Sequence, residues 1–205
     1  MNTYFAKKTE SSLSIADPRW QEVAFAEHAF RWQDGSPSPY TSGFRLVHSP
    51  LGITVRIEAN EWPLRAVRTV CNEQICEDSC MEFFFTPNEE EKQYLNVEVN
   101  PLGVTHVGLG EGRHGRRLVD ISGEGLEIET SIRFGKGWAV CLFIPYTFID
   151  KYFAKHTAAW RMNSYKCGDL TVVEHYATWN PIEVPKPDYH RPEYFGSLRL
   201  CEEML

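Results

Sequence analysis

Short runs in which apolar and polar residues alternate recur along the chain, and they constrain its fold more than any other feature. The runs Gly52–Ala59, Gln93–Asn100 and Leu126–Arg133 each place aliphatic side chains on one face and mostly polar side chains on the other. Such period-two patterning predicts β-strands with one buried face, because successive side chains of a strand point to opposite sides. The run Trp138–Ile144 is apolar on both faces and is predicted to be a central strand.

These runs are separated by turn-forming residues, such as the glycines of "FGKGW". Helix is scarce, with one or two turns predicted after Pro145, where proline takes a favoured first-turn position. One-sided strands bury their apolar faces against a second layer. We therefore predict an all-β fold, an antiparallel two-sheet β-sandwich of the jelly-roll type with little helix.

A single domain over residues 1–205 is expected, with its core at about residues 15–200. The chain has 205 residues, enough to bury one sizeable core, and no low-complexity linker divides it. The stretch Asp34–Gly43, rich in proline and serine, is predicted to be a long surface loop.

Charge and hydropathy exclude two classes of partner. The formal net charge is −7, whereas a nucleic-acid surface needs a basic stripe. No run of about 20 apolar residues exists that could span a membrane. The N-terminal segment has no apolar stretch typical of a secretion signal, which predicts a cytoplasmic protein. If a leader had been removed, the protein would instead be extracellular or periplasmic.

Most of the six cysteines are expected to be free thiols packed as small apolar side chains in a reducing compartment. Their even number would permit disulfides in an exported protein. A zinc site is disfavoured, because Cys71, Cys76 and Cys80 lack the tight Cys-x-x-Cys spacing of zinc knuckles.

Several segments together resemble the family 9 carbohydrate-binding modules, especially their stand-alone relatives. The resemblance covers the chain from about Ile15 to Leu200 and is carried by "IADPRWQEVA", "EDSCMEFFFTP", "YLNVEVNPLG", "WRMNSYKCGD" and "WNPIEVPKPDYHRPEYFGSLRL". It implies a jelly-roll β-sandwich that binds sugars without catalytic residues of its own. Such modules are frequently appended to xylan-degrading enzymes. The ligands implied are mono- or oligosaccharides of plant, xylan or glucan origin, linked to carbohydrate catabolism.

The resemblance implies five site residues. The glutamate that binds ligand hydroxyls falls on Glu82 and an asparagine with the same role on Asn100, while the family's arginine position is Glu98. A family glutamine aligns with Tyr165, and one of two tryptophans that clamp the sugar ring aligns with Tyr189.

The second clamp tryptophan has no aromatic counterpart here. It falls near Ile75 or Cys76. The stretch "CEDSCMEFFF" is therefore predicted to be a central strand. Its Glu82 is expected to face the binding surface and its phenylalanines to pack in the core.

The chemistry of these residues suits a sugar site, which combines aromatic rings with planar polar groups. Glu98 and Asn100 point to the same side of their strand, together with Asn96. The pattern alone favours a solvated outer face for this row. Tyr189 lies in a proline-rich tail segment that serves either as a rigid cover or as an aromatic platform.

The remaining aromatic and basic residues have structural interpretations. Large aromatic side chains are highly buried on average, so Trp20, Trp160 and Trp179 are expected in the core. The arginines of "GEGRHGRRL" are expected on a solvated turn, with contact to a ligand as the alternative.

Two other functions stay open. A glycoside hydrolase would use a pair of carboxyl groups, for which Glu82 and Glu98 are candidates. A haem-binding β-sandwich would take axial ligands from a set of methionines and histidines, namely Met81, Met162, His106 and His175. No cofactor is firmly indicated.

The resemblance also allows structural calcium near acidic loops. Possible oxygen donors are Asp17, Glu22, Asp78 and Asp169, although no dense Asp-x-Asp-x-Asp run is present.

Overall fold

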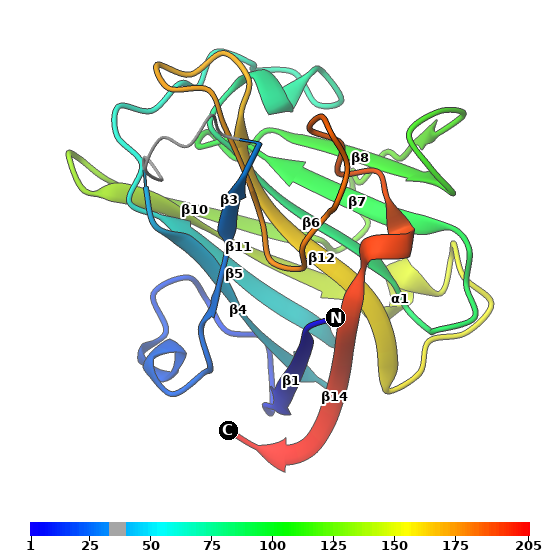
Figure 1. The fold of residues 1–205 in the computed structure, drawn as a ribbon. Coiled ribbons are helices and arrows are strands. Elements are labelled where there is room, and N and C mark those ends of the chain that lie inside the picture. The colour runs from blue at the N-terminus through cyan, green and yellow to red at the C-terminus, as the bar shows by residue number, and fades with distance from the viewer. Residues whose placement is uncertain (33–39) are drawn as a thin grey trace.

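The computed structural model describes residues 1–32 and 40–205, which are mostly β (Figure 1). Helix is confined to the single turn α1 (Tyr146–Ile149) and to the 3₁₀ turns η1 (Pro18–Gln21), η2 (Ile75–Glu77) and η3 (Pro192–Tyr194) within this part of the chain. The strands are β1 (Thr3–Lys8), β2 (Ala26–Glu27), β3 (Ala29–Arg31), β4 (Ser42–Ser49), β5 (Gly52–Ala59), β6 (Cys80–Thr86), β7 (Tyr94–Val99), β8 (Thr105–Gly110), β9 (Arg117–Leu118), β10 (Glu127–Arg133), β11 (Gly137–Pro145), β12 (Ala159–Gly168), β13 (His175–Thr178) and β14 (Gly196–Met204). The expectation of a β protein with little helix is confirmed.

The strands of the described residues form one continuous curled sheet in place of two separate ones. Its order is β10-β11-β5-β4-β1-β14-β12-β6-β7-β8-β9, with β2, β3 and β13 beside this path. β1 pairs in parallel with both β14 and β4, so the expectation of a purely antiparallel arrangement is wrong at this seam. Alternation of side chains fixes which face a strand buries but not which strand lies beside it, and the sequence therefore gave no sign of the seam.

The concave side of the sheet encloses the main hydrophobic core. Ile53, Val55 and Ile57 of β5 contribute to it, as do Phe83 and Phe85 of β6, and all five are fully buried. The two layers of the curled sheet thus pack against each other as the alternating patterns require.

The predicted strands lie where the patterns indicated. β5 has the bounds that the sequence predicted, and β7, β10 and β11 differ from the predicted runs by at most one residue at either end. Trp20, Trp160 and Trp179 are buried, as expected. The loop expected over Asp34–Gly43 falls largely on residues 33–39, outside the described residues, and its last two residues begin β4.

The opposite face of β6, β7 and β12 is also covered, which corrects the expectation of a solvated outer face. Tyr94, Asn96 and Asn100 are fully buried and Glu98 is 7% exposed. A second apolar cluster lies here, formed by Phe84 of β6 with tail residues such as Ile182, Tyr189 and Phe195. The tail segment, residues 179–195 between β13 and β14, returns across this face (Figure 1). Local periodicity does not encode such a long-range contact.

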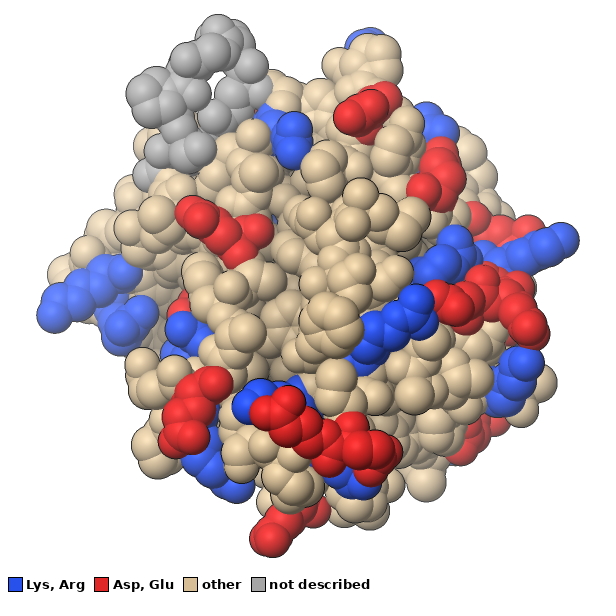
Figure 2. Space-filling model, turned by 60° about the horizontal axis from the view of Figure 1, so that its bottom comes forward, with Lys and Arg blue, Asp and Glu red and all other residues tan. Residues whose placement is uncertain are grey.

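Charged side chains of both signs lie beside one another on the face shown in Figure 2. Lys7 and Lys8 at the end of β1 pair with Glu203 and Glu202 of β14 across the parallel seam. None of the helices in the described part of the chain is long and apolar enough to cross a membrane.

Candidate functional site

A cavity of about 240 Å³ lies over the covered face of β6, β7 and β12. Strand, loop and tail residues meet around it. The lining residues are Cys76, Glu82, Glu98, Arg113, Cys167, Asp169, Tyr176, Pro187, Asp188, Tyr189 and His190. Three of the five residues expected at the site, Glu82, Glu98 and Tyr189, therefore come together.

Glu82 and Glu98 form the polar centre of the cavity. They are directly opposite each other on β6 and β7, so both side chains point to the same face. Asn96 Nδ2 donates to Glu98 Oε1 over 3.0 Å, and the Cys167 thiol donates to Glu82 Oε1 over 3.0 Å. Both carboxyl groups are nearly excluded from solvent.

Burial and mutual repulsion change the protonation of this carboxyl pair. Desolvation and the neighbouring Glu98 carboxylate raise the pKa of Glu82 well above its usual value. Desolvation also raises the pKa of Glu98, against the opposing influence of His106. Two carboxyl groups so close in a desolvated site retain a proton between them to higher pH than isolated ones. The pair then offers a hydrogen-bond donor as well as acceptors.

Tyr189 and Tyr165 form an aromatic wall. Their rings stack in parallel, with centroids 4.1 Å apart and planes at 7°. The Tyr189 hydroxyl donates to the Lys166 carbonyl and accepts from the Ala177 amide. Tyr165 lies behind Tyr189, fully buried, and its hydroxyl donates to the Tyr189 carbonyl. Tyr165 supports the wall and does not line the cavity.

Asn100 lies away from the cavity lining. Its Nδ2 donates to the Arg68 carbonyl and to Asp78 Oδ2, and its Oδ1 accepts from the amides of Leu102 and Val104. The asparagine thus closes the turn after β7 and holds the segment before η2 in place.

The tail segment supplies lining residues that sequence reasoning did not assign to the site. Arg113 Nε donates to Asp188 Oδ1 over 3.0 Å, joining the loop after β8 to the tail. Burial acts against ionisation of Asp188, yet Arg113 and Arg191 hold its pKa below the usual range. His190 Nδ1 lies 2.7 Å from the Tyr94 hydroxyl. The clustering of charged residues in "PKPDYHRP" was the available signal.

Tyr176 and Asp169 were also missed as lining residues. Tyr176 of β13 meets Tyr189 edge to face, with ring centroids 6.3 Å apart. Asp169 follows β12, and burial raises its pKa. Tyr176 lies outside the segments that carry the resemblance and reaches the cavity through the pairing of β13 with β12, whereas Asp169 ends one of those segments.

The arginine-rich turn is only partly solvated. Arg116 lies over the Tyr94 ring, 4.2 Å from its centroid, and donates to the carbonyls of Tyr94 and Gly108. The expectation of a solvated turn is therefore wrong for Arg116, whereas the Arg117 side chain is exposed.

The acidic residues considered for calcium do not converge. Asp17 binds Arg19 through both carboxylate oxygens, and Asp78 Oδ2 accepts from the amides of Val67 and Arg68. Glu22 is exposed and Asp169 faces the cavity. These donors do not fit a shared calcium site.

The residues considered for haem also lie apart from the cavity lining. Met81 and Met162 are fully buried in the main core. His175 lies 2.7 Å from the Lys166 ammonium group, and His106 Nδ1 lies 3.1 Å from the Glu73 carbonyl. All six cysteines carry free thiols, and two of them, Cys76 and Cys167, line the cavity.

Solved structures share this fold. One is described as "a putative carbohydrate-binding protein" from Bacteroides uniformis, with a TM-score of 0.82, 23% identity and coverage of 97% of this chain and 98% of that one. A family 9 carbohydrate-binding module from Caldicellulosiruptor kristjanssonii in complex with cellotriose has a TM-score of 0.69 at 12% identity, covering 98% of this chain and 95% of that one. The same module in complex with glucose gives the same score and identity, covering 98% and 97%.

Sequence comparison leads to the same group of proteins. No curated protein matches the sequence significantly. The family model described as "Carbohydrate-binding family 9" matches residues 13–200, which is most of the chain. The chain therefore belongs to carbohydrate-binding family 9.

Proposed function

We propose that this protein binds carbohydrate at the cavity over β6, β7 and β12 and does not turn it over. The observation that carries the proposal is that Glu82, Glu98 and Tyr189, from three separate segments, line one cavity. Family membership over residues 13–200 supports the ligand class and the single domain expected for the chain.

The cavity presents the groups that a sugar requires. Sugars combine many hydroxyl groups with apolar C–H faces, so their sites pair planar polar groups with aromatic rings. Glu82 and Glu98 supply hydrogen-bond acceptors and a shared proton, and Arg113 adds a cationic donor at the rim. Tyr189 supplies the aromatic surface, held rigid by Tyr165.

The size of the cavity favours a small ligand or a chain end. Its volume of about 240 Å³ is below the roughly 300–1,000 Å³ of pockets for drug-sized ligands. A single sugar ring, free or at the end of a plant-derived xylan or glucan oligosaccharide, suits this volume. The similar module from Caldicellulosiruptor kristjanssonii was solved with glucose and with cellotriose, which supports glucans as the first ligands to test.

The alternative is a glycoside hydrolase that uses Glu82 and Glu98. A hydrolase needs its two carboxyl groups on either side of the scissile bond. Here the pair comes from directly opposed positions on adjacent strands, so both groups stand on one wall of the cavity. That arrangement favours binding over hydrolysis.

Titration calorimetry with glucose, xylose, cellotriose and xylotriose tests the proposal. We expect binding to at least one of these sugars, weakened by about 1–3 kcal/mol in Glu82→Gln, because the amide cannot reproduce the hydrogen bonds of the carboxyl pair to the sugar hydroxyls. The exposed Glu10→Gln is the matched control and should bind normally. Chromatography of the same mixtures should recover the oligosaccharides intact. Shorter products that disappear with Glu82→Gln would establish the hydrolase instead.

A further inference from the structure

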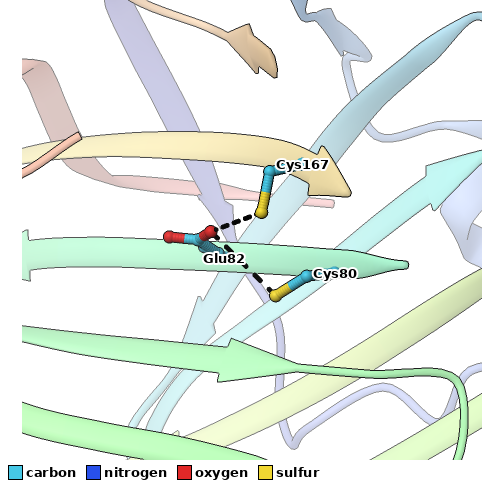
Figure 3. Close-up of side chains that lie close together, drawn as sticks. All are labelled: Cys80, Glu82 and Cys167. Carbon is cyan, nitrogen blue, oxygen red and sulfur yellow. Dashed lines mark hydrogen bonds between the residues drawn. The ribbon is translucent and has the colours of Figure 1, made fainter. Parts of the chain in front are cut away.

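Two thiols and a carboxyl group converge on the covered face of β6 and β12 (Figure 3). Cys80 and Glu82 are two positions apart on β6 and so share one face, while Cys167 stands directly opposite Cys80 on β12. One ligand atom from each residue lies within 4.8 Å of the other two, and all three side chains are buried.

We propose that Cys80, Cys167 and Glu82 form a binding site for a thiophilic divalent ion of the zinc class. Zn²⁺ takes cysteine sulfur at about 2.3 Å and carboxylate oxygen at about 2.0–2.2 Å in tetrahedral geometry. These bond lengths place sulfur and oxygen ligands roughly 3.5 Å apart around one ion. Glu82 Oε1 lies 3.0 Å from Cys167 Sγ and 4.0 Å from Cys80 Sγ, so small side-chain adjustments reach that spacing.

The cavity gives the ion a route and a fourth coordination position. Glu82 and Cys167 line the cavity wall, so the ion can enter from solvent without opening the sheet. Cys76 and Asp169 line the same cavity, and a water molecule in it can complete the tetrahedron. Carboxylate and thiolate donors together discriminate against calcium and magnesium, which prefer all-oxygen sites.

Metal binding must displace protons. Burial raises the pKa of Cys80 to about 12, and the hydrogen bond with Cys80, followed by burial, raises the pKa of Cys167, so both thiols are neutral in the metal-free protein. Binding breaks two S–H bonds, forms two metal–sulfur bonds and one metal–oxygen bond to Glu82, and releases both thiol protons to solvent. The proton that the carboxyl pair retains stays on Glu98.

Charged groups around the cluster both favour and oppose the loss of protons that metal binding requires. The buried Lys166 ammonium group favours the anionic ligands, as its lowering effect on the pKa of Cys80 and Glu82 shows. Glu98 and Asp169 oppose them by adding negative charge at the cavity.

The spacing of cysteines along the chain concealed this cluster. Cys80 and Cys167 are 87 positions apart, and only the pairing of β6 with β12 makes them neighbours. The inference does not rest on sugar binding, although Glu82 belongs to both sites. A bound ion is expected to compete with sugar for that carboxylate.

Cobalt titration of the reduced protein under anaerobic conditions tests the site without any sugar. We expect one equivalent of Co²⁺ to give thiolate-to-metal charge-transfer bands together with the intense visible bands of tetrahedral cobalt, and Zn²⁺ to displace it. Cys80→Ser and Cys167→Ser keep a hydrogen-bonding hydroxyl beside Glu82 and should weaken binding by more than about tenfold. The matched control is Cys141→Ser, which should titrate like the wild type. The Cys141 thiol is buried on β11 and donates to the Leu13 carbonyl, away from the cluster.

Thermal melts of the wild-type protein and each variant, with and without Zn²⁺, keep the test independent of folding defects. Zn²⁺ should raise the melting temperature of the wild type and Cys141→Ser, because an ion that binds only the folded state stabilises it. It should not raise that of a folded Cys80→Ser or Cys167→Ser. Octahedral cobalt spectra, charge-transfer bands that survive both substitutions, or a Cys80–Cys167 disulfide in the isolated protein would overturn the proposal.

Discussion

Tyr165 and Tyr189 stack face to face with their ring centroids 4.1 Å apart, although Tyr165 belongs to β12 and Tyr189 to the tail segment. The contact fixes the tail against the sheet and makes one wall of the proposed sugar site. Because Tyr189 is 7% exposed, it contributes to stability and to the site at once. These two roles can be separated by substitution.

Tyr189→Phe should lower stability while sugar affinity stays unchanged. The ring and its stacking remain, but the Ala177 amide and the Lys166 carbonyl lose their hydroxyl partner. An unpaired buried amide costs about 1–3 kcal/mol. Tyr189→Ala should lose about 3–5 kcal/mol of stability and also the affinity for sugar. Urea denaturation and calorimetry measure the two effects. Loss of affinity in Tyr189→Phe would mean that the hydroxyl itself contacts the ligand.

Glu82→Gln should flatten the dependence of stability on pH. The folded pKa of Glu82 lies above its unfolded value of about 4.3, so the folded state holds the proton more tightly. The resulting stabilisation is complete below the unfolded pKa and is lost as pH rises through the folded pKa. Unfolding free energies in urea at a series of pH values should therefore decline less in Glu82→Gln than in the wild type.

The control for this measurement is Glu90→Gln. The exposed Glu90 carboxylate pairs with Lys155, which holds its pKa below the usual range, so its removal should not reduce the decline. Equal slopes for Glu82→Gln and the wild type would show that Glu82 is already ionised at low pH in the folded protein.

Arg113→Ala should weaken sugar binding more than it weakens the fold. Arg113 is half exposed, and an ion pair of this kind contributes at most about 1 kcal/mol to stability. Its pairing with Asp188 nevertheless holds the tail beside the cavity that both residues line. Faster sugar dissociation with a nearly unchanged melting temperature is the expected result. Arg117→Ala on the same loop serves as the control, and equal dissociation rates in all three proteins would contradict the role.

Lys166→Met should destabilise the protein by about 3–5 kcal/mol, since it leaves the Glu61 carboxylate buried without its cation. The Lys166 ammonium group lies 2.9 Å from Glu61 Oε2, and both side chains are fully buried. Replacing both residues with apolar ones, as in Lys166→Met with Glu61→Leu, should cost less than the two single changes added together. A double-mutant cycle in urea measures this coupling, and strict additivity would show that the pair is not coupled.

The strands were predictable and their assembly was not. The strand β5 could be predicted from Ile53, Val55 and Ile57, because burial of one face of a strand places an apolar residue at every second position. The same rule misjudged Asn96 and Glu98, which alternate as if they faced solvent but are buried, Asn96 beside Arg116 and Glu98 in the cavity. The second face of the sheet is covered because the tail segment contacts β6 and β7, about a hundred positions earlier in the chain. No local pattern records such a contact.

The site shows the same division between local and long-range information. Resemblance to the family marked Glu82, Glu98 and Tyr189, which line the cavity, but it also marked Asn100, which closes a turn. The Cys80–Cys167 pair stayed hidden because it is a product of strand register. Residue identity suggested which chemistry was available, and strand pairing decided which groups meet.

The parallel pairing of β1 with β14 has a mechanical consequence. Thr3 lies beside Ser197 and Lys8 beside Met204, so the first strand begins at one end of the seam and the last strand finishes at the other. A force applied between the two chain ends therefore pulls these strands past each other along their length. The hydrogen bonds of the seam share such a load and must break together, whereas an antiparallel hairpin opened from its ends would release them one after another.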